Sequence, residues 1–371
     1  MYIVIAFVNT LSKKVQESSS NNSTSSNHVV PFTPQVQMKM FHQDSSNTKA
    51  DINCDTSFSA GTLKAARRAA GAVAHAVDRV LMGRNRNAFC VVRPPGHHAG
   101  YRGLLDGAKS CGFCIFNNVA AGAFHALETH NCERVAIIDI DVHHGNGTED
   151  IVRRYPHPSR IFFFSLHLYE KSAEDTTTAA GGAGGGYEFF PGSGGEDDTT
   201  HNIINVPLMP MWLENSKGSG TRSTAKSNVQ QPSRSGRDAY KQAISQRLIP
   251  ALRAFSPDLI LLSTGFDAAE GDVGNVKNEA PVGGIARGMD LRPIDFEWTT
   301  TELLKVADLC CNGRIVSVLE GGYGSYPSKK QSTGGRGVGL DRNILSECSA
   351  AHVDRLIDPY GQIYEPSTSP F

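Results

Sequence analysis

The run VAIIDIDVHHG at residues 135–145 decides the fold. Its first half is a short, continuous apolar stretch, which is typical of a strand that is buried on both faces of a parallel sheet. Its second half places carboxylate and imidazole side chains directly after that strand. In open α/β sheets, ligands bind beyond the carboxyl ends of the strands. The run therefore predicts a buried strand with a functional site at its end.

Four further apolar runs are predicted to be strands of the same sheet. They are AFCVV (88–92), IFFFSL (161–166), LILLS (259–263) and IVSVL (315–319). Helical patterns separate them near 59–81, 117–129, 238–254 and 295–311; the first has its apolar face at Leu63, Ala66, Ala70, Val73, Val77 and Leu81 and ends near Gly83. Buried strands that alternate with helices indicate a mostly parallel sheet covered on both faces. The predicted fold class is a three-layer α/β/α fold.

Composition excludes several classes of protein. The 36 Lys and Arg residues balance 37 Asp and Glu residues, so the sequence offers no basis for direct binding to nucleic acid or to an anionic membrane surface. No run approaches the ~18 apolar residues of a membrane span. MYIVIAFV (1–8) lacks the basic region and cleavage pattern of a secretory signal. The eight cysteines lie mostly in or beside apolar runs, which predicts reduced thiols in a soluble protein of the nucleus or cytoplasm.

Low-complexity stretches divide the chain. Residues 1–50 are expected to be a poorly ordered segment rich in Ser and Asn, with 17–28 the most polar part. A single catalytic domain over 51–357, followed by a tail at 358–371, is implied by the family resemblance that the motifs below carry. The segments 171–186 and 214–237 interrupt the strand and helix pattern, and we interpret them as loop insertions at the surface.

Three side chains form a candidate zinc site. Asp141 and His143 are two residues apart, so in extended chain they project to the same side and can reach one cation. Asp267 follows the LILLS strand at the same edge of the sheet. Two carboxylates and one imidazole leave a tetrahedral Zn²⁺ with an open position for water. The alternative, that each aspartate only caps a turn, requires several strand ends to gather costly polar groups by chance.

Two other strand ends carry groups that such a site needs. AFCVV leads into RPPGHHAG (93–100), which presents His97 and His98 as candidate general bases. IVSVL leads into EGGYG (320–324), where Tyr323 is a candidate hydrogen-bond donor to an oxyanion. Taken singly, a surface histidine or a packed tyrosine is the ordinary interpretation of these residues.

Six motifs, in this order, resemble the zinc-dependent histone deacetylase family. They are RPPGHHAG (93–100), GFCIFNNVAAGA (112–123), DIDVHHGNGTEDI (139–151), FFPGSG (189–194), STGFDAAEGD (263–272) and LEGGYG (319–324). The Arg-Pro-Pro before the histidine pair and the Glu before the glycines resemble the class II branch. The resemblance implies the arginase/deacetylase fold, with a mostly parallel eight-stranded sheet between helices, and an enzyme that hydrolyses N-ε-acetyl-lysine in histones or other proteins.

The resemblance also implies the catalytic roles. Asp141, His143 and Asp267 would bind the zinc ion, and water activated by that ion would attack the acetyl carbonyl. His98 would take the proton of this water and pass it to the leaving amine, with His97 as its partner. Asp139 would face His97, and Asn146 would face His98. Tyr323 and zinc would share the negative charge of the oxyanion. Because the position of Asn146 is usually Asp in class I, His98 should be held less strongly as imidazolium.

Further residues are implied to bind substrate or a second ion. Phe113 and Phe190 match the aromatic walls of a narrow tunnel for the lysine stem, and the Gly112 carbonyl matches an acceptor for the substrate amide. Asp55 matches a carboxylate at the rim. Asp139, Asp141, His143, Ser165 and Leu166 resemble a structural potassium site, so the implied cofactors are Zn²⁺ and K⁺.

The sequence leaves other functions open. An acetylpolyamine deacetylase would need an acidic gatekeeper, for which Glu270 or Asp272 could serve. A scaffold or acetyl-lysine reader without activity is the non-enzymatic alternative. A binuclear manganese hydrolase is disfavoured, because Gly145 stands where a second metal needs a carboxylate. The CxxC spacing of CGFC (111–114) has no second pair, which disfavours a redox or zinc-knuckle role.

Expected partners and architecture also follow from the resemblance. Acetylated histone tails or other acetyl-lysine proteins are the expected substrates, within a corepressor complex in the nucleus or cytoplasm. The family carries a longer segment ahead of the stretch that matches residues 51–66. We expect either that residues 1–8 replace the first strand or that the chain is a truncated product.

Overall fold

The protein is described here from a computed structural model. The residues that it describes are 8–13, 15–16, 30–32, 55–103, 105, 110–170, 189–216, 236–276, 287–326 and 340–361. The polar stretch 17–28 and the insertion 171–186 lie outside them, as do most of the insertion 214–237 and most of the tail 358–371.

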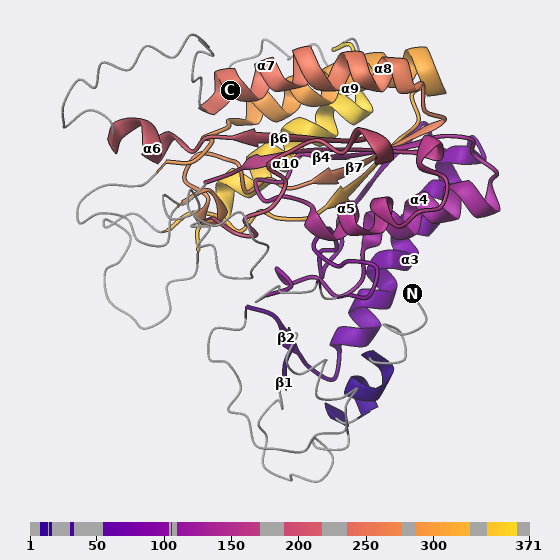
Figure 1. Cartoon of the computed structure of the whole chain (residues 1–371), viewed down its shortest axis with the longest axis vertical. Helices are drawn as coiled ribbons and strands as arrows, with labels where there is room; N and C mark the ends of the chain where they lie inside the picture. Colours follow the sequence, from indigo (N-terminus) through magenta and orange to yellow (C-terminus); the bar gives the residue numbers. More distant parts are fainter. Residues whose placement is uncertain are drawn as a thin grey trace, which may run out of the picture.

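A parallel sheet of six strands forms the centre of the molecule (Figure 1). In spatial order the strands are β3 (Asn87–Cys90), β8 (Ile315–Leu319), β7 (Leu259–Thr264), β4 (Val135–Asp139), β5 (Ile161–Leu168) and β6 (Ile203–Leu208). Every neighbouring pair is parallel. All residues of β4, β5 and β7 are buried, which explains why these strands are continuous apolar runs.

The predicted fold class is confirmed, with one difference in strand number. The five predicted strands are all present, but the central sheet has six strands among the described residues rather than the eight that the resemblance implied. The sixth, β6, was missed because Asn205 and Pro207 interrupt its apolar run. Pro207 is tolerated in β6 because this strand lies at the edge of the sheet.

Helices cover both faces of the sheet (Figure 1). One face packs against α3 (Thr62–Leu81), α4 (Asn118–Thr129) and α5 (Asn146–Arg153). The other packs against α7 (Gly236–Ala243), a π-helical turn (Ile244–Leu248), α8 (Ile249–Phe255), α9 (Pro293–Cys311) and α10 (Asn343–Ile357). Successive residues of β4 alternate between these two cores, as the pleat of a strand requires. No helix in the described part of the chain is long and apolar enough to cross a membrane.

Shorter elements complete the fold. A further helix, α6, spans Met211–Ser216, and 3₁₀ turns span Pro158–Arg160, Thr199–His201 and Val273–Asn275. The predicted helices correspond to α3, α4, the segment from α7 to α8, and α9, whereas α5, α6 and α10 were not predicted. In α3 the buried residues are Ala66, Ala69, Val73, Ala76, Val77 and Val80, close to the predicted apolar face.

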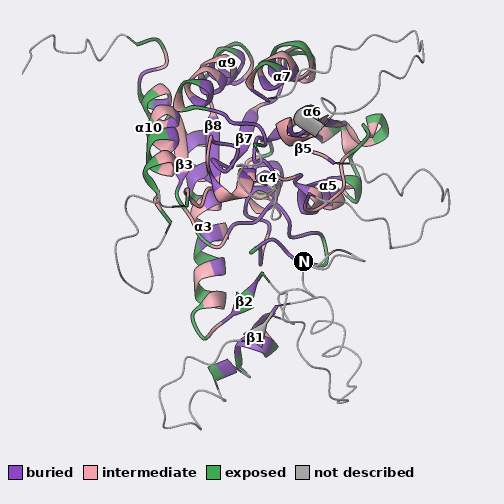
Figure 2. Cartoon of the chain, turned by 90° about the vertical axis from the view of Figure 1, so that its left-hand side faces the viewer, coloured by how far each residue is buried: buried purple, intermediate pink, exposed green. Residues whose placement is uncertain are grey.

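The N-terminal part contributes a small third core. Residues 8–13 and 15–16 are helical, and β1 (Val30–Pro31) pairs antiparallel with β2 (Ser57–Phe58). Val8, Leu11 and Val15 are buried against Phe32, Phe58, Ala66, Cys111 and Ile115. Figure 2 shows β1 and β2 beyond the end of α3, away from the central sheet. The predicted poorly ordered segment thus includes residues that pack on the domain. Residues 1–7, the bulk of the proposed replacement strand, lie outside the described residues.

A buried histidine joins α9, α10 and β8. His352 Nδ1 lies 2.7 Å from Thr300 Oγ1, and its Nε2 lies 3.0 Å from Ser317 Oγ. Thr300 already donates its hydroxyl proton to the Phe296 carbonyl, so it accepts from Nδ1–H while Ser317 donates to Nε2. Burial lowers the pKa of His352 to about 3. This side chain therefore contributes to the fold as a neutral imidazole.

We expect the protein to become less stable as the pH is lowered, because His352 resists protonation in the folded state. An unfolded histidine titrates near pH 6.5, so between that pH and about 3 the unfolded chain binds a proton that the folded protein does not. Stability is complete above pH 6.5 and falls by about 1.4 kcal/mol per pH unit below it. His352→Gln removes this dependence, so urea unfolding at pH 6 and pH 5 should show a smaller loss in the variant. Equal losses of stability in the parent and in His352→Gln would contradict the prediction. His157→Gln, which changes an exposed side chain, is the control.

Candidate active site

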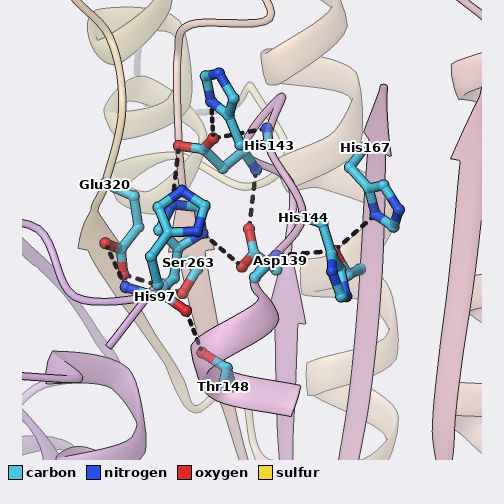
Figure 3. A network of polar contacts seen from close by, with 12 residues as sticks. His97, Asp139, His143, His144, Thr148, His167, Ser263 and Glu320 are labelled. Carbon is cyan, nitrogen blue, oxygen red and sulfur yellow. Dashed lines mark hydrogen bonds and ion pairs between the residues drawn. The ribbon is translucent and has the colours of Figure 1, made fainter. Parts of the chain in front are cut away.

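The candidate site lies at the carboxyl ends of the central strands (Figure 3). The register pairs Asp139 at the end of β4 with Ser263 of β7 and with Ser165 of β5. Thr264 of β7 pairs with Leu319 of β8. The polar segments that follow β3, β4, β7 and β8 are therefore brought to one edge of the sheet, as the sequence predicted.

Asp141, His143 and Asp267 form a cluster that could hold a metal ion. Their ligand atoms lie within 4.8 Å of one another. His143 Nδ1 is 3.1 Å from Asp141 Oδ1 and 3.1 Å from Asp267 Oδ2. Both carboxylates are buried, and backbone amides hold them in place: Gly321 donates to Asp141, and Val142 donates to Asp267. The three predicted zinc ligands are thus brought together.

The charges of this cluster favour a cation. Burial and the neighbouring charge of Asp141 raise the pKa of Asp267 to about 7. Burial opposes the charged form of His143, yet its hydrogen bonds to Asp141 and Asp267 raise its pKa to about 9. Two buried carboxylates this close repel each other unless positive charge lies between them. One imidazole and two carboxylates are donors that Zn²⁺ accepts, so the residues fit the predicted ion.

His97 and His98 are neighbours with opposite electrostatics. His97 Nδ1 donates to Asp139 Oδ2 at 2.9 Å, whereas His98 Nδ1 donates to the neutral Asn146 Oδ1 at 2.8 Å. Burial would lower the pKa of His97, but the charges of Asp139 and Asp141 raise it to about 10. Burial and the charges of His97 and His143 hold the pKa of His98 well below its ordinary value. His98 is therefore the neutral member of the pair, the state required of a proton acceptor.

Glu320 holds the loop that carries these histidines, a role that the sequence analysis did not assign. Its Oε2 accepts from the backbone amides of Gly96 at 2.6 Å and of His97 at 3.2 Å. Its Oε1 accepts from Ser263 at 3.2 Å, and its carbonyl accepts from Arg93. Figure 3 shows His97 with Glu320 on one side and Asp139 on the other. The sequence feature that could have indicated this role is a glutamate directly after the apolar run 315–319.

Asp272 fixes the turn that presents Tyr323. Its Oδ2 accepts from the backbone amides of Tyr323 at 2.9 Å and Gly324 at 2.7 Å, and its Oδ1 accepts from Gly274 at 2.8 Å. Burial and the charges of Asp267 and Asp141 raise the pKa of Tyr323 well above its ordinary value. The phenol therefore keeps its proton beside the metal cluster and can donate a hydrogen bond.

The two predicted aromatic walls contact different residues of the site. The Phe190 ring is 4.9 Å from the His98 ring and 6.1 Å from the His143 ring, measured between centroids. The Phe113 ring is 5.8 Å from the Tyr323 ring and remains 38 % exposed. Phe189, which was not predicted, stacks on His143 at 5.1 Å. Apolar rings thus surround the polar cluster and limit its contact with water.

The segment around Gly112 lies directly against His98. A side-chain β-carbon at Gly112 would come within 2.3 Å of His98 Cδ2, and its φ of +52° also favours glycine. Asp55 accepts from Ser110 and from Thr56, and the Thr56 hydroxyl in turn accepts from the Phe113 amide at 2.8 Å. Asp55 is exposed. The predicted rim carboxylate is therefore connected to the wall residue Phe113.

Two expected gatekeepers are engaged elsewhere. Asp272 is fully buried and holds the backbone amide of Tyr323, so the interpretation of it as a possible gatekeeper is wrong. Glu270 pairs with Arg287 at 2.8 Å and with Arg292 at 3.1 Å. Its charge is therefore balanced by two guanidinium groups. Neither residue offers an unpaired carboxylate to a cationic substrate.

Two other ion sites were considered from the sequence, a second metal beside Gly145 and a structural potassium site. A β-carbon at Gly145 would lie 2.2 Å from Asp139 Oδ2, so this position has no space for a second carboxylate ligand. For the predicted potassium site, Asp139 pairs with Ser165 across β4 and β5, and Ser165 Oγ lies 3.0 Å from His167 Nδ1. The potassium ion itself stays a prediction.

The cysteines of the CGFC segment are packed rather than paired. Cys111 Sγ lies 3.6 Å from the Phe32 carbonyl, and the His98 amide donates to Cys114 Sγ at 3.4 Å. Burial raises the pKa of Cys114 well above its ordinary value, which suppresses the reactive thiolate. All seven cysteines in the described ranges are free thiols.

Comparison with known proteins places this site in context. The family described as histone deacetylase domain matches residues 5–334. Type-2 histone deacetylase 2 of Dictyostelium discoideum is 33 % identical over 304 residues, which cover 82 % of this chain and 14 % of that protein. The polyamine deacetylase HDAC10 of Mus musculus is 34 % identical over 266 residues, covering 72 % of this chain and 32 % of that protein.

A bacterial relative and a solved structure agree with this match. The histone deacetylase-like amidohydrolase of Pseudomonas aeruginosa is 32 % identical over 275 residues, covering 72 % of this chain and 56 % of that protein. The crystal structure of the HDA15 HD domain superposes with a TM-score of 0.57 and 28 % identity, covering 82 % of this chain and 66 % of that one. The chain thus spans between 14 % and 56 % of the three curated relatives named here.

We expect Gly112→Ala to destabilise the protein. The added methyl group would contact His98 at 2.3 Å, and overpacking of this kind costs about 1–3 kcal/mol. Urea unfolding should therefore show a lower midpoint. Gly71→Ala is the matched control, because Gly71 lies within α3 with nothing within 4 Å of its β-carbon position. That variant should gain about 0.5–1 kcal/mol. A Gly112→Ala protein as stable as its parent would show that the space beside His98 is not filled.

Proposed function

This chain belongs to the histone deacetylase family, and we propose that it is a zinc-dependent hydrolase that removes acetyl groups from N-ε-acetyl-lysine side chains of proteins. One observation carries the proposal: the ligand atoms of Asp141, His143 and Asp267 converge beside His98, whose pKa is held low, and Tyr323, whose pKa is raised. Acetylated histone tails or other acetyl-lysine proteins of the nucleus or cytoplasm are the proposed substrates.

The metal ligands support a single zinc ion. Asp141, His143 and Asp267 would hold it, and the fourth position would remain open, as in catalytic zinc sites. When bound, Zn²⁺ supplies a Lewis acid that activates a water molecule and polarises the acetyl carbonyl. The absence of space at Gly145 argues against a binuclear site.

His98 is the proposed proton carrier. It is neutral because it is buried beside His97 and faces the amide of Asn146 rather than a carboxylate. A neutral imidazole can take a proton from the attacking water and return it to the leaving lysine amine. Hydrogen bonding between Nδ1 and Asn146 leaves Nε2 as the atom that exchanges the proton. His97, which is hydrogen-bonded to Asp139, supplies positive charge beside His98.

Tyr323 is the proposed oxyanion donor. The amide bonds between Asp272 and the 323–324 turn fix the position of the phenol before substrate arrives. A donor that is held in advance stabilises the developing negative charge on the acetyl oxygen without reorganisation. The raised pKa keeps the phenolic proton in place at neutral pH.

The apolar side chains support a lysine stem as the bound group. Phe190 packs on His98, and Phe113 faces Tyr323, so both rings border the groups that perform the chemistry. Burying the four methylene groups of lysine against aromatic faces contributes about 0.8 kcal/mol for each CH₂. Because Glu270 is paired and Asp272 is buried, neither expected gatekeeper favours a polyamine over a protein.

Deacetylation of a peptide is the direct test. We expect the zinc-loaded protein to release acetate from an acetyl-lysine peptide and to be inhibited by a hydroxamate chelator. Tyr323→Phe should lose about 100-fold or more in kcat, because one oxyanion donor is removed. Asp267→Ala should abolish turnover together with zinc binding, and Glu270→Gln should retain turnover.

The same assay separates the alternatives. Faster hydrolysis of acetylspermidine than of the peptide would favour a polyamine deacetylase. A folded, zinc-loaded protein that binds the acetylated peptide without releasing acetate would contradict the proposal and support a reader.

The pH dependence tests the role of Asn146. Asn146→Asp places a negative charge 2.8 Å from His98 Nδ1, which should raise the pKa of His98 by about 1–3 units. Because the protonated imidazole cannot accept a proton, the acid limb of kcat/KM should move to higher pH by a similar amount. An acid limb that does not move would show that His98 is not the general base.

A further inference from the structure

A second cluster of metal-ligand side chains lies outside the candidate active site. Asp78 of α3, His125 of α4 and His130 at the end of α4 offer ligand atoms within 4.8 Å of one another. The Nε2 atoms of His125 and His130 lie 2.6 Å and 2.8 Å from the same oxygen, Asp78 Oδ1. We propose that these three side chains bind a divalent cation of the Zn²⁺ class at the protein surface.

A neighbouring hydroxyl prepares His125 for this role. Its other ring nitrogen, Nδ1, lies 3.2 Å from Thr129 Oγ1, one helical turn further along α4. When Nδ1–H donates to this hydroxyl, Nε2 carries a lone pair that points at the Asp78 carboxylate. A cation between them then satisfies both atoms. Metal-binding histidines commonly donate their second nitrogen in this way, which fixes the tautomer and the orientation of the ring.

The geometry suits an ion that enters from solvent. The side chains of Asp78, His125 and His130 are 38 %, 26 % and 19 % exposed, so an ion can reach them and water can fill the remaining position. Tetrahedral zinc with bonds of about 2.0–2.1 Å separates its ligand atoms by roughly 3.3 Å. Each imidazole nitrogen therefore needs to move away from the carboxylate oxygen by about 0.5–0.7 Å, a small change for partly exposed side chains.

The donor set selects the class of cation. Two neutral imidazoles and one carboxylate suit Zn²⁺, Ni²⁺ or Cu²⁺, whereas Mg²⁺ and Ca²⁺ require oxygen ligands almost exclusively. The three residues come from two helices, so the bound ion would join α3 to α4 on the face of the sheet that both helices cover (Figure 1).

This site is separate from the candidate active site. His130 lies ahead of β4, at the amino-terminal edge of the sheet, whereas Asp139 and Asp141 lie at and beyond the carboxyl end of the same strand. Loss of the surface ion should therefore leave the chemistry at Asp141 and Asp267 unaffected. The two sites can be emptied independently by substitution.

Zinc titration of the full chain tests the proposal. The protein is stripped of metal, and Zn²⁺ is titrated in competition with a chromophoric chelator. We expect the double variant His125→Ala/His130→Ala to bind one equivalent fewer than the parent and to retain deacetylase activity within twofold. In an Asp267→Ala background, the equivalent that remains should be lost on adding the double substitution.

Two further variants make the result decisive. Asp78→Asn keeps a carbonyl acceptor for the imidazoles, so it should fold even if the double variant does not, and it should weaken binding at this site at least tenfold. His201→Ala is the matched control, because His201 also pairs with a surface aspartate, Asp198, but belongs to no three-ligand cluster among the described residues. It should bind as much zinc as the parent. If the parent, Asp78→Asn and the double variant bind equal amounts with equal affinity, the three residues only share hydrogen bonds and the proposal is overturned.

Discussion

Two buried carboxylates, Asp141 and Asp267, lie side by side at the ends of adjacent strands, and the rest of the site compensates for their repulsion. Removing them from water and placing them together is costly unless positive charge and hydrogen-bond donors surround them. His143 lies 3.1 Å from both, and the amides of Gly321 and Val142 donate to them. A divalent cation would neutralise the remaining negative charge. The parallel register of the strands therefore brings together the ligands of a metal site.

The register alone does not orient the groups that act on the substrate, and two further carboxylates do so. Glu320 receives backbone amides from the loop that carries His97, and Asp272 receives them from the turn that carries Tyr323. Both carboxylates are buried and accept from main-chain donors, so they fix loops rather than contact ligand. The reactive residues therefore lie on short loops whose backbone these two carboxylates hold in place.

Most of the fold and the metal ligands could be predicted because apolar runs end at polar residues. Asp141 and Asp267 each follow a strand that is buried on both faces, and this pattern is visible locally. By contrast, β6 was missed because Asn205 and Pro207 interrupt its apolar run, and Pro207 is tolerated there because β6 is an edge strand. The role of Asp272 was misjudged because two of its three amide partners, Tyr323 and Gly324, are brought to it by the tertiary structure. Contacts of this kind leave no periodic signal in a sequence.

The histidine pair shows how one site maintains two protonation states. His97 and His98 are adjacent and both are buried, so desolvation acts on both in the same direction. Only their partners differ: Asp139 is a carboxylic acid that can be charged, whereas Asn146 is an amide that cannot. The charged partner stabilises one imidazolium, and that imidazolium then disfavours a second charge on its neighbour. The low pKa of His98 thus depends on the charge of His97 as well as on the neutral Asn146. Neither contact alone determines which histidine acts as the general base.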